Sequence, residues 1–211
     1  MPDSKNLNVL NHPLIQQKLT YLRDKRTDSA GFRDLLNELS ALMVYEITRQ
    51  LPTRKISVQT PLEDSSGNIL ANPVILVPIL RAGLAMCDGI LHLIPQARVG
   101  HLGLYRDEKT LQAISYYKKF PNDMSHSDIF IIDPMLATGG SAVSAIDKVK
   151  TAGGKRIYFV CLVAAPEGVA KINNQYGDIP IYTAALDREL NEKSYILPGL
   201  GDAGDRIYGT V

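Results

Sequence analysis

The chain has few cysteines, on which many small extracellular proteins depend, and little excess positive charge, on which nucleic-acid-binding proteins depend. Its 211 residues include only two cysteines and no tryptophan, and the net charge is +1 at neutral pH. Cys87 and Cys161 lie in apolar surroundings without a pair spacing typical of zinc or redox sites, so we expect two reduced core residues. The balanced charge provides no basic face for sequence-independent binding of nucleic acid. Nucleic acid is therefore not an expected partner.

Long apolar runs are missing as well. No run approaches the roughly 20 residues that a membrane helix needs. The first ten residues are polar and lack the apolar core of a secretion signal. We therefore expect a cytoplasmic protein without a membrane partner that acts on small molecules. The histidines show no ligand spacing and are interpreted as structural: His12, His92, His101 and His126.

What the sequence does contain is an alternation of apolar strands and amphipathic helices. With 45% hydrophobic residues, a chain of this length can form one compact domain over residues 1–211. The alternation predicts an α/β fold with a doubly wound parallel sheet flanked by helices. The strand candidates are Val74–Val77, Ile129–Ile132, Ile157–Val163 and Ile181–Ala184. The helix candidates between them are Leu84–Leu93, Ala142–Lys150 and Gly168–Gln175.

Two further segments lie outside this alternation. Apolar residues at helical spacing between Phe32 and Ile47 predict a helix that opens after Thr27, Asp28 and Ser29, within an N-terminal helical cover over about residues 12–50. Residues 104–119 place tyrosines on either side of a charged centre. We interpret the region of about 105–120 as a mobile β arm.

Two apparent phosphate-binding motifs are rejected. Residues 199–204 match the dinucleotide fingerprint G-x-G-x-x-G, but only seven residues follow, too few for a helix and a second strand. The Gly139-Gly140-Ser141 turn lacks the lysine of a P-loop. A nicotinamide or flavin site and a P-loop ATPase are therefore excluded.

The most informative segment runs from Ile129 to Ala142. Residues 129–132 are typical of a strand covered on both faces, and Asp133-Pro134 ends it. The loop that follows offers backbone N–H groups with little side-chain bulk, and the next helix places its positive end behind them. The Asp133 carboxylate can accept hydrogen bonds from sugar hydroxyls while the loop that contains Thr138 binds a phosphate. Asp133 and Thr138 together therefore fit a ribose 5-phosphate. The alternative is an ordinary strand–turn–helix unit with a capping Thr or Ser.

This loop resembles the phosphoribosyl-pyrophosphate signature of type I phosphoribosyltransferases. Many members carry two adjacent acids after the strand, whereas Asp133-Pro134 is similar to the variant of the uracil phosphoribosyltransferase family. The resemblance covers nearly the whole chain. Its other segments are 12–15, 18–20, 22–23, 32–33, 45–46, 78–83, 103–106 and 198–206.

The resemblance implies a set of site residues. Those expected to bind 5-phospho-α-D-ribose 1-diphosphate (PRPP) are Arg81, Arg106, Asp133, Pro134, Met135, Leu136, Ala137, Thr138, Gly139, Gly140, Ser141 and Asp202. Of these, Arg81, Arg106, Asp133 and Asp202 are expected to be catalytic. A hood over about residues 195–206 is expected to bind uracil through Ile196, Gly201, Asp202 and Ala203. Small residues there let main-chain groups approach a flat ring. Tyr195 is either a pocket wall or a core residue.

Each assignment has a simpler alternative. Arg81 follows a strand end, where a guanidinium can hold pyrophosphate, but an isolated arginine more often forms a surface salt bridge. Arg106 lies in a charged stretch that would also suit a solvated turn. Residues 195–206 would also suit a Gly-rich turn with capping acids.

The implied reaction joins uracil to PRPP and gives UMP and pyrophosphate. Mg²⁺ is expected to enter with PRPP rather than on a protein ligand set. The family further implies a homo-oligomer and, in some members, a response to GTP. The alternatives are a purine phosphoribosyltransferase and a regulatory protein that senses the same donor.

Overall fold

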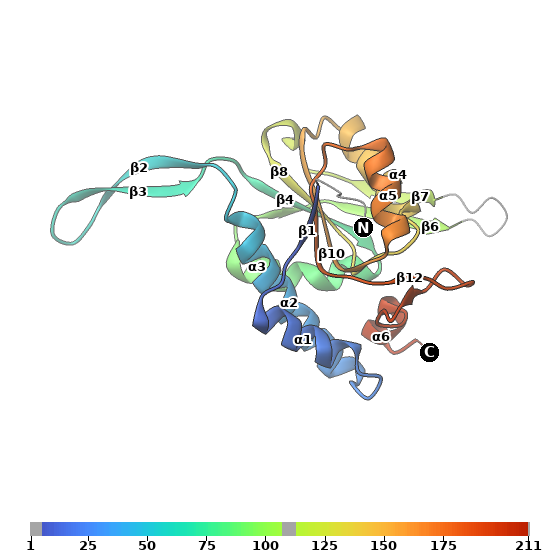
Figure 1. Cartoon of the computed structure of the whole chain (residues 1–211). Coiled ribbons are helices and arrows are strands. Elements are labelled where there is room, and N and C mark those ends of the chain that lie inside the picture. The colour runs from blue at the N-terminus through green and yellow to red at the C-terminus, as the bar shows by residue number, and fades with distance from the viewer. Residues whose placement is uncertain (1–5, 107–112, 211) are drawn as a thin grey trace.

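A central, mostly parallel sheet organises the protein (Figure 1). The computed structural model describes residues 6–106 and 113–210. Neighbouring strands pair in parallel except at the last pair, β6 with β7. Across the sheet the order is β1 (Leu7–Val9), β11 (Ile181–Leu186), β10 (Arg156–Ala164), β8 (Asp128–Ile132), β4 (Val74–Leu80), β6 (His101–Arg106) and β7 (Ala113–Lys119). Two short strands complete it: β5 (Arg98–Val99) beside β4 and β9 (Met135–Leu136) beside β10. The predicted α/β class and its four strands are confirmed.

Helices cover both faces of the sheet, which explains why its central strands are apolar throughout. In β8, Phe130 and Ile132 enter one core cluster while Ile129 and Ile131 enter the other. Since strand side chains alternate between faces, a strand buried on both sides shows no polar alternation. The first face carries α1 (Pro13–Arg23), α2 (Ser29–Thr48), α3 (Cys87–Leu93) and α6 (Ala203–Tyr208); the second carries α4 (Gly140–Thr151) and α5 (Pro166–Gln175).

Capping residues in the sequence mark where several helices begin. The predicted helix over 32–47 is α2, and the Asp28 carboxylate accepts the Gly31 N–H at 2.8 Å to cap it. At α1 the His12 ring accepts the Leu14 N–H at 3.2 Å. The predicted helix over 84–93 is divided into a 3₁₀ turn, η1 (Ala82–Met86), and α3. Among the described helices, none is long and apolar enough to cross a membrane.

One hairpin was not predicted. Strands β2 (Thr53–Gln59) and β3 (Asp64–Leu70) pair along their whole length and extend away from the sheet and its helices (Figure 1). Their side chains are almost all exposed, so the sequence lacks the apolar alternation that marks a half-buried strand. A second small sheet, β12 (Glu189–Leu190) with β13 (Ile196–Leu197), was also missed because each strand has two residues.

The expected β arm is present as the antiparallel pair β6 and β7. Residues 107–112, which join these strands, lie outside the described residues. A short turn, η2 (Met124–His126), leads from the arm into β8. Cys87 and Cys161 are both buried and free, as predicted.

The order in which the chain adds strands to the sheet reverses between the two central strands, β4 and β8. After β4 the chain continues through α3 on the first face to β6, and after β8 it continues through α4 on the second face to β10. The loops that leave β4 and β8 therefore separate in opposite directions at the carboxyl edge of the sheet. Such a point opens a crevice, which is where ligands bind in open α/β sheets.

Candidate functional site at the switch point of the sheet

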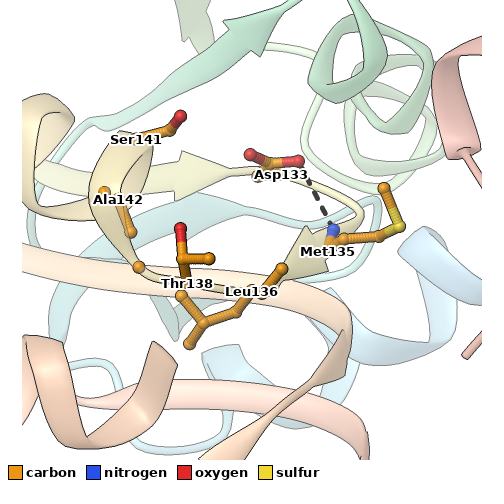
Figure 2. A pocket seen from close by; sticks show the side chains of 9 residues that line it. Asp133, Met135, Leu136, Thr138, Ser141 and Ala142 are labelled. Atoms are coloured by element: carbon orange, nitrogen blue, oxygen red, sulfur yellow. Dashed lines mark hydrogen bonds between the residues drawn. The ribbon is translucent and has the colours of Figure 1, made fainter. Parts of the chain in front are cut away.

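The loop after β8 encloses a pocket at this edge. The pocket has a volume of about 90 Å³ and is lined by Asp133 and residues 135–142. Figure 2 shows the side chains of Asp133, Thr138 and Ser141 around it. Of the loop residues predicted from sequence, only Pro134 does not line the pocket.

Main-chain pairing with β10 fixes this loop. The Pro134 carbonyl accepts N–H groups from Leu162 at 3.0 Å and Val163 at 3.2 Å, and the Leu136 carbonyl accepts the Ala165 N–H at 2.8 Å. These hydrogen bonds to the loop's carbonyl groups attach the loop to the sheet. At the other end α4 has no side-chain cap, so the N–H groups of its first turn are available to an anion in the pocket.

Gly139 allows the chain to turn into α4. Its φ is 76°, in the left-handed region that favours glycine. A Cβ at this position would lie 3.0 Å from the Gly168 carbonyl oxygen on α5. Helix α5 therefore supports the loop from behind, and both the conformation and the packing require a residue without a side chain here.

Asp133 forms the acidic side of the pocket, with a pKa raised to about 7. Burial is the main cause, the Met135 N–H at 3.4 Å opposes it, and the negative charge of Asp202 adds to it. The carboxyl thus changes charge near neutral pH, and Asp202 lies close enough for its charge to raise the pKa of Asp133.

The raised pKa makes the stability of the free protein depend on pH. Because the folded protein keeps this proton up to about pH 7 and an unfolded chain loses it near 3.8, the contribution is fully present at low pH. It declines as pH rises from about 4 to about 7, by a few kcal/mol at most, since one pKa unit is worth about 1.4 kcal/mol. Urea unfolding at pH 5 and pH 8 should therefore show a larger loss for the wild type than for Asp133→Asn. Equal losses would contradict the shift.

Arg81 reaches the same edge from the loop after β4. Its guanidinium carbon lies 5.6 Å from the centre of the Tyr208 ring, whose hydroxyl donates to the Arg81 carbonyl at 3.1 Å. A Cβ on Gly204 would lie 3.9 Å from Nη2 of Arg81, so the guanidinium adjoins the start of α6. The structure thus brings Arg81, Asp133 and Asp202 together from three separate elements.

A second, more apolar pocket adjoins Arg81. It measures about 420 Å³ and is lined by Leu80, Arg81, Leu84, Tyr116 and Tyr208. Because Tyr116 belongs to β7, the arm reaches this side of the crevice. Arg106 ends β6, but its side chain and residues 107–112 lie outside what the structure describes.

The segment expected to hold a base follows β12. Asp202 caps α6, and its carboxylate accepts the Asp205 N–H at 3.0 Å. Ile196 and Ala203 are buried in the first core cluster, so only their main-chain groups are free to face a ligand, while Gly201 is exposed. Tyr195 is 44% exposed, which excludes the core position for it.

One cation near the loop was missed in the sequence. A Cβ on Gly140 would lie 4.0 Å from Nζ of Lys171 and 3.8 Å from Oγ1 of Thr138. Lys171 is on α5, whose close packing against the loop brings it there. Nothing in the local sequence pattern marks this lysine, because the approach depends on how two helices pack.

Comparisons with known proteins agree over almost the full chain. The model of the family described as uracil phosphoribosyltransferase matches residues 9–210. The chain is 54% identical over 203 residues to the uracil phosphoribosyltransferase of Dictyoglomus turgidum, covering 96% of this chain and 98% of that protein. The chain belongs to the uracil phosphoribosyltransferase family. The protein of that name from Bacillus pumilus is 55% identical over 203 residues, with 96% and 97% covered.

Solved structures share the fold. The structure of the AQ2163 protein from Aquifex aeolicus superposes with a TM-score of 0.91 at 37% identity, covering 96% of this chain and 97% of that one. A hypoxanthine-guanine phosphoribosyltransferase from Bacillus anthracis superposes with a TM-score of 0.52 at 12% identity, covering 75% and 80%. At that identity the second match shows the fold alone. The predicted family and fold are both confirmed.

Proposed function

We propose that the chain transfers the 5-phosphoribosyl group of PRPP to uracil, giving UMP and diphosphate, a step of pyrimidine salvage. Family membership supports the enzymatic activity. The position of the active site is inferred from one observation: Arg81, Asp133 and Asp202 lie near one another beside the pocket of residues 135–142. This convergence lies at the edge of the sheet where α/β enzymes bind ligands.

The 5-phosphate occupies the pocket formed by the loop. Backbone N–H groups from Thr138 to Ser141 and the two hydroxyls donate to its oxygens, and the positive end of α4 lies behind them. Asp133 accepts hydrogen bonds from the ribose hydroxyls, and its ionised form is the better acceptor. Binding of the sugar would thus favour the charged carboxylate at neutral pH.

The diphosphate lies beside Arg81, and the family resemblance adds Arg106 as a second contact. Both guanidinium groups suit bidentate contacts to phosphate oxygens. Two carboxylates, Asp133 and Asp202, face the site, and no group of three or more metal-binding side chains is found among residues 6–106 and 113–210. This donor set fits Mg²⁺ that would arrive with PRPP beside Asp133 and Asp202, and its charge would offset that of the diphosphate.

Uracil is bound by main-chain groups of Ile196, Gly201 and Ala203, with Asp202 between them. A run of N–H and C=O groups matches the acceptor, donor, acceptor edge of the base without a charged side chain. The bond between the anomeric carbon and the diphosphate oxygen breaks as N1 of uracil attacks from the opposite face, and N1 releases its proton to solvent while the diphosphate leaves with the bonding electrons. Positive charge develops on the sugar, so alignment of the two reactants and the negative charge of Asp133 stabilise the transition state.

The experiment that tests this function measures products. Purified protein with Mg²⁺ and PRPP is offered uracil, cytosine, adenine, guanine and hypoxanthine, and nucleotide formation is followed. UMP alone is the expected product. A purine nucleotide would support the purine alternative, and tight PRPP binding without any nucleotide would support a sensor of the donor.

Lys171 gives a further test of the phosphate position. We expect Lys171→Ala to raise KM for PRPP about threefold at low salt, with a smaller effect at 0.5 M salt, because an exposed charge is screened. KM for uracil should stay unchanged. Lys55→Ala, on the exposed β2 strand, is the matched control, and an equal effect of both variants would argue against a phosphate near α5.

The family resemblance also leads us to propose a cytoplasmic homo-oligomer and an effect of GTP. Analytical ultracentrifugation measures the first, with a single monomeric species as the contradicting result. Initial rates with and without GTP measure the second, with identical rates as the contradicting result.

A further inference from the structure

A buried ion pair connects the end of α1 to the segment that enters the base site. Nη1 and Nη2 of Arg23 donate to the two carboxylate oxygens of Asp187 at 2.8 and 2.6 Å. Arg23 is the last residue of α1 and Asp187 follows β11, so the pair joins distant parts of the chain. Neither residue has a place in the proposed chemistry.

The same two side chains hold both main-chain groups of Gly199. Asp187 Oδ2 accepts the Gly199 N–H at 3.0 Å, and Nη1 of Arg23 donates to the Gly199 carbonyl at 2.7 Å. Because the ion pair binds both the N–H and the C=O of Gly199, it restricts the backbone conformation of that residue. We refer to Arg23, Asp187 and Gly199 as the Gly199 clamp.

The acidic end of the clamp is shielded from water and the arginine is partly buried. The side chain of Asp187 is 5% exposed and that of Arg23 is 21% exposed. Charged hydrogen bonds in such surroundings are stronger and more directional than those on a surface, and removal of one partner leaves the other charge buried. A surface pair would not hold the backbone in this way.

A second arginine fixes the neighbouring residue. Nη1 of Arg206 donates to the carbonyls of Leu200 at 2.9 Å and Leu22 at 2.7 Å. The end of α1 is therefore tied to both Gly199 and Leu200, the two residues that precede Gly201. Leu200 is buried in the first core cluster, whereas Gly199 and Gly201 have no side chain to pack, so the position of Gly199 depends on these main-chain contacts.

We propose that Arg23 and Asp187 are positioning residues for uracil: the Gly199 clamp fixes the main chain that leads into Gly201, Asp202 and Ala203. This inference rests on the proposed binding of the base by that segment. Among the described residues, no side-chain hydrogen bond or ion pair of Arg23 or Asp187 involves the loop at 135–141 or Arg81. Loss of the clamp should therefore impair uracil binding while leaving PRPP binding nearly unchanged.

The test uses two variants that act on different partners. Asp187→Asn removes the charge that Arg23 needs, and Arg23→Lys keeps a cation but loses the fork that reaches both Asp187 and Gly199. For each we expect KM for uracil to rise about tenfold and KM for PRPP to stay within about twofold. Arg49→Lys is the matched control, because it alters a bidentate pair with Glu46 on the exposed surface of α2.

The outcomes separate this inference from the proposed function. In the wild type, UMP should slow hydrogen exchange in both 135–141 and 196–206; protection of the first region alone would overturn the base assignment and the clamp's role together. Protection of both, with equal changes in the two KM values or with none, would overturn the clamp alone. If Asp187→Asn does not fold, Arg23→Lys decides, since it preserves the buried charge.

Discussion

Replacement of Asp133 by asparagine is expected to lower kcat/KM for PRPP by about 10²- to 10³-fold. Asparagine has nearly the same size, so the loop and its Met135 contact can persist. What is lost is the negative charge beside a sugar that becomes positive in the transition state, and removal of one such stabilising group typically has an effect of this size. Steady-state formation of UMP with PRPP as the varied substrate measures it.

The reduction should lie mainly in kcat, with uracil binding preserved. Asp178→Asn is a suitable control, because Asp178 is an exposed acid that pairs with Lys150 at 3.8 Å. A fall of less than threefold for Asp133→Asn, or a similar fall for Asp178→Asn, would contradict the assignment of Asp133 to the sugar.

Gly83→Ala should be similarly damaging, through geometry rather than charge. A Cβ on Gly83 would lie 2.3 Å from the Ile132 carbonyl oxygen, in the backbone just before Asp133. Because neither backbone can yield locally, the loops after β4 and β8 must move apart. A displacement near 1 Å between catalytic groups can cost about 10²-fold in rate, and overpacking costs about 1–3 kcal/mol in stability.

Rates of UMP formation and urea unfolding, measured on the same preparation, test this expectation. Gly67→Ala provides the control, since a Cβ at Gly67 would meet only Val58 at 4.0 Å, on the exposed hairpin. Unchanged kcat in Gly83→Ala would show that the spacing between Arg81 and Asp133 is not required.

The buried parts of the fold were the most predictable from sequence. Strands β4 and β8 are covered on both faces, so they appear as unbroken apolar runs wherever they stand in the chain. The start of α2 was also placed correctly, after Thr27, Asp28 and Ser29, of which Asp28 is the cap, because capping acts over three residues. In contrast, β2 and β3 bury almost nothing, and a strand pair without an apolar face has no sequence signal.

The candidate site likewise has a part that could be predicted from the sequence and a part that could not. The loop from Asp133 to Ser141 is contiguous, so its strand, acid, small residues and helix start could be recognised together. The positions of Lys171 and of the Gly199 clamp depend on how distant elements pack, as when Arg23 of α1 meets Asp187 beyond β11. Periodicity and spacing describe residues close together along the chain, whereas the contacts of the Gly199 clamp join residues far apart in the sequence. Sequence patterns therefore could not predict them.

The most direct test of the account is a crystal structure of the wild-type protein with UMP bound. We predict that the phosphate accepts hydrogen bonds from the backbone of residues 138–141. The ribose hydroxyls should contact Asp133, and uracil should meet the main chain of Gly201 and Ala203. A nucleotide bound with its phosphate away from this loop, or with its base away from residues 196–203, would contradict the placement of the reaction at the switch point between β4 and β8.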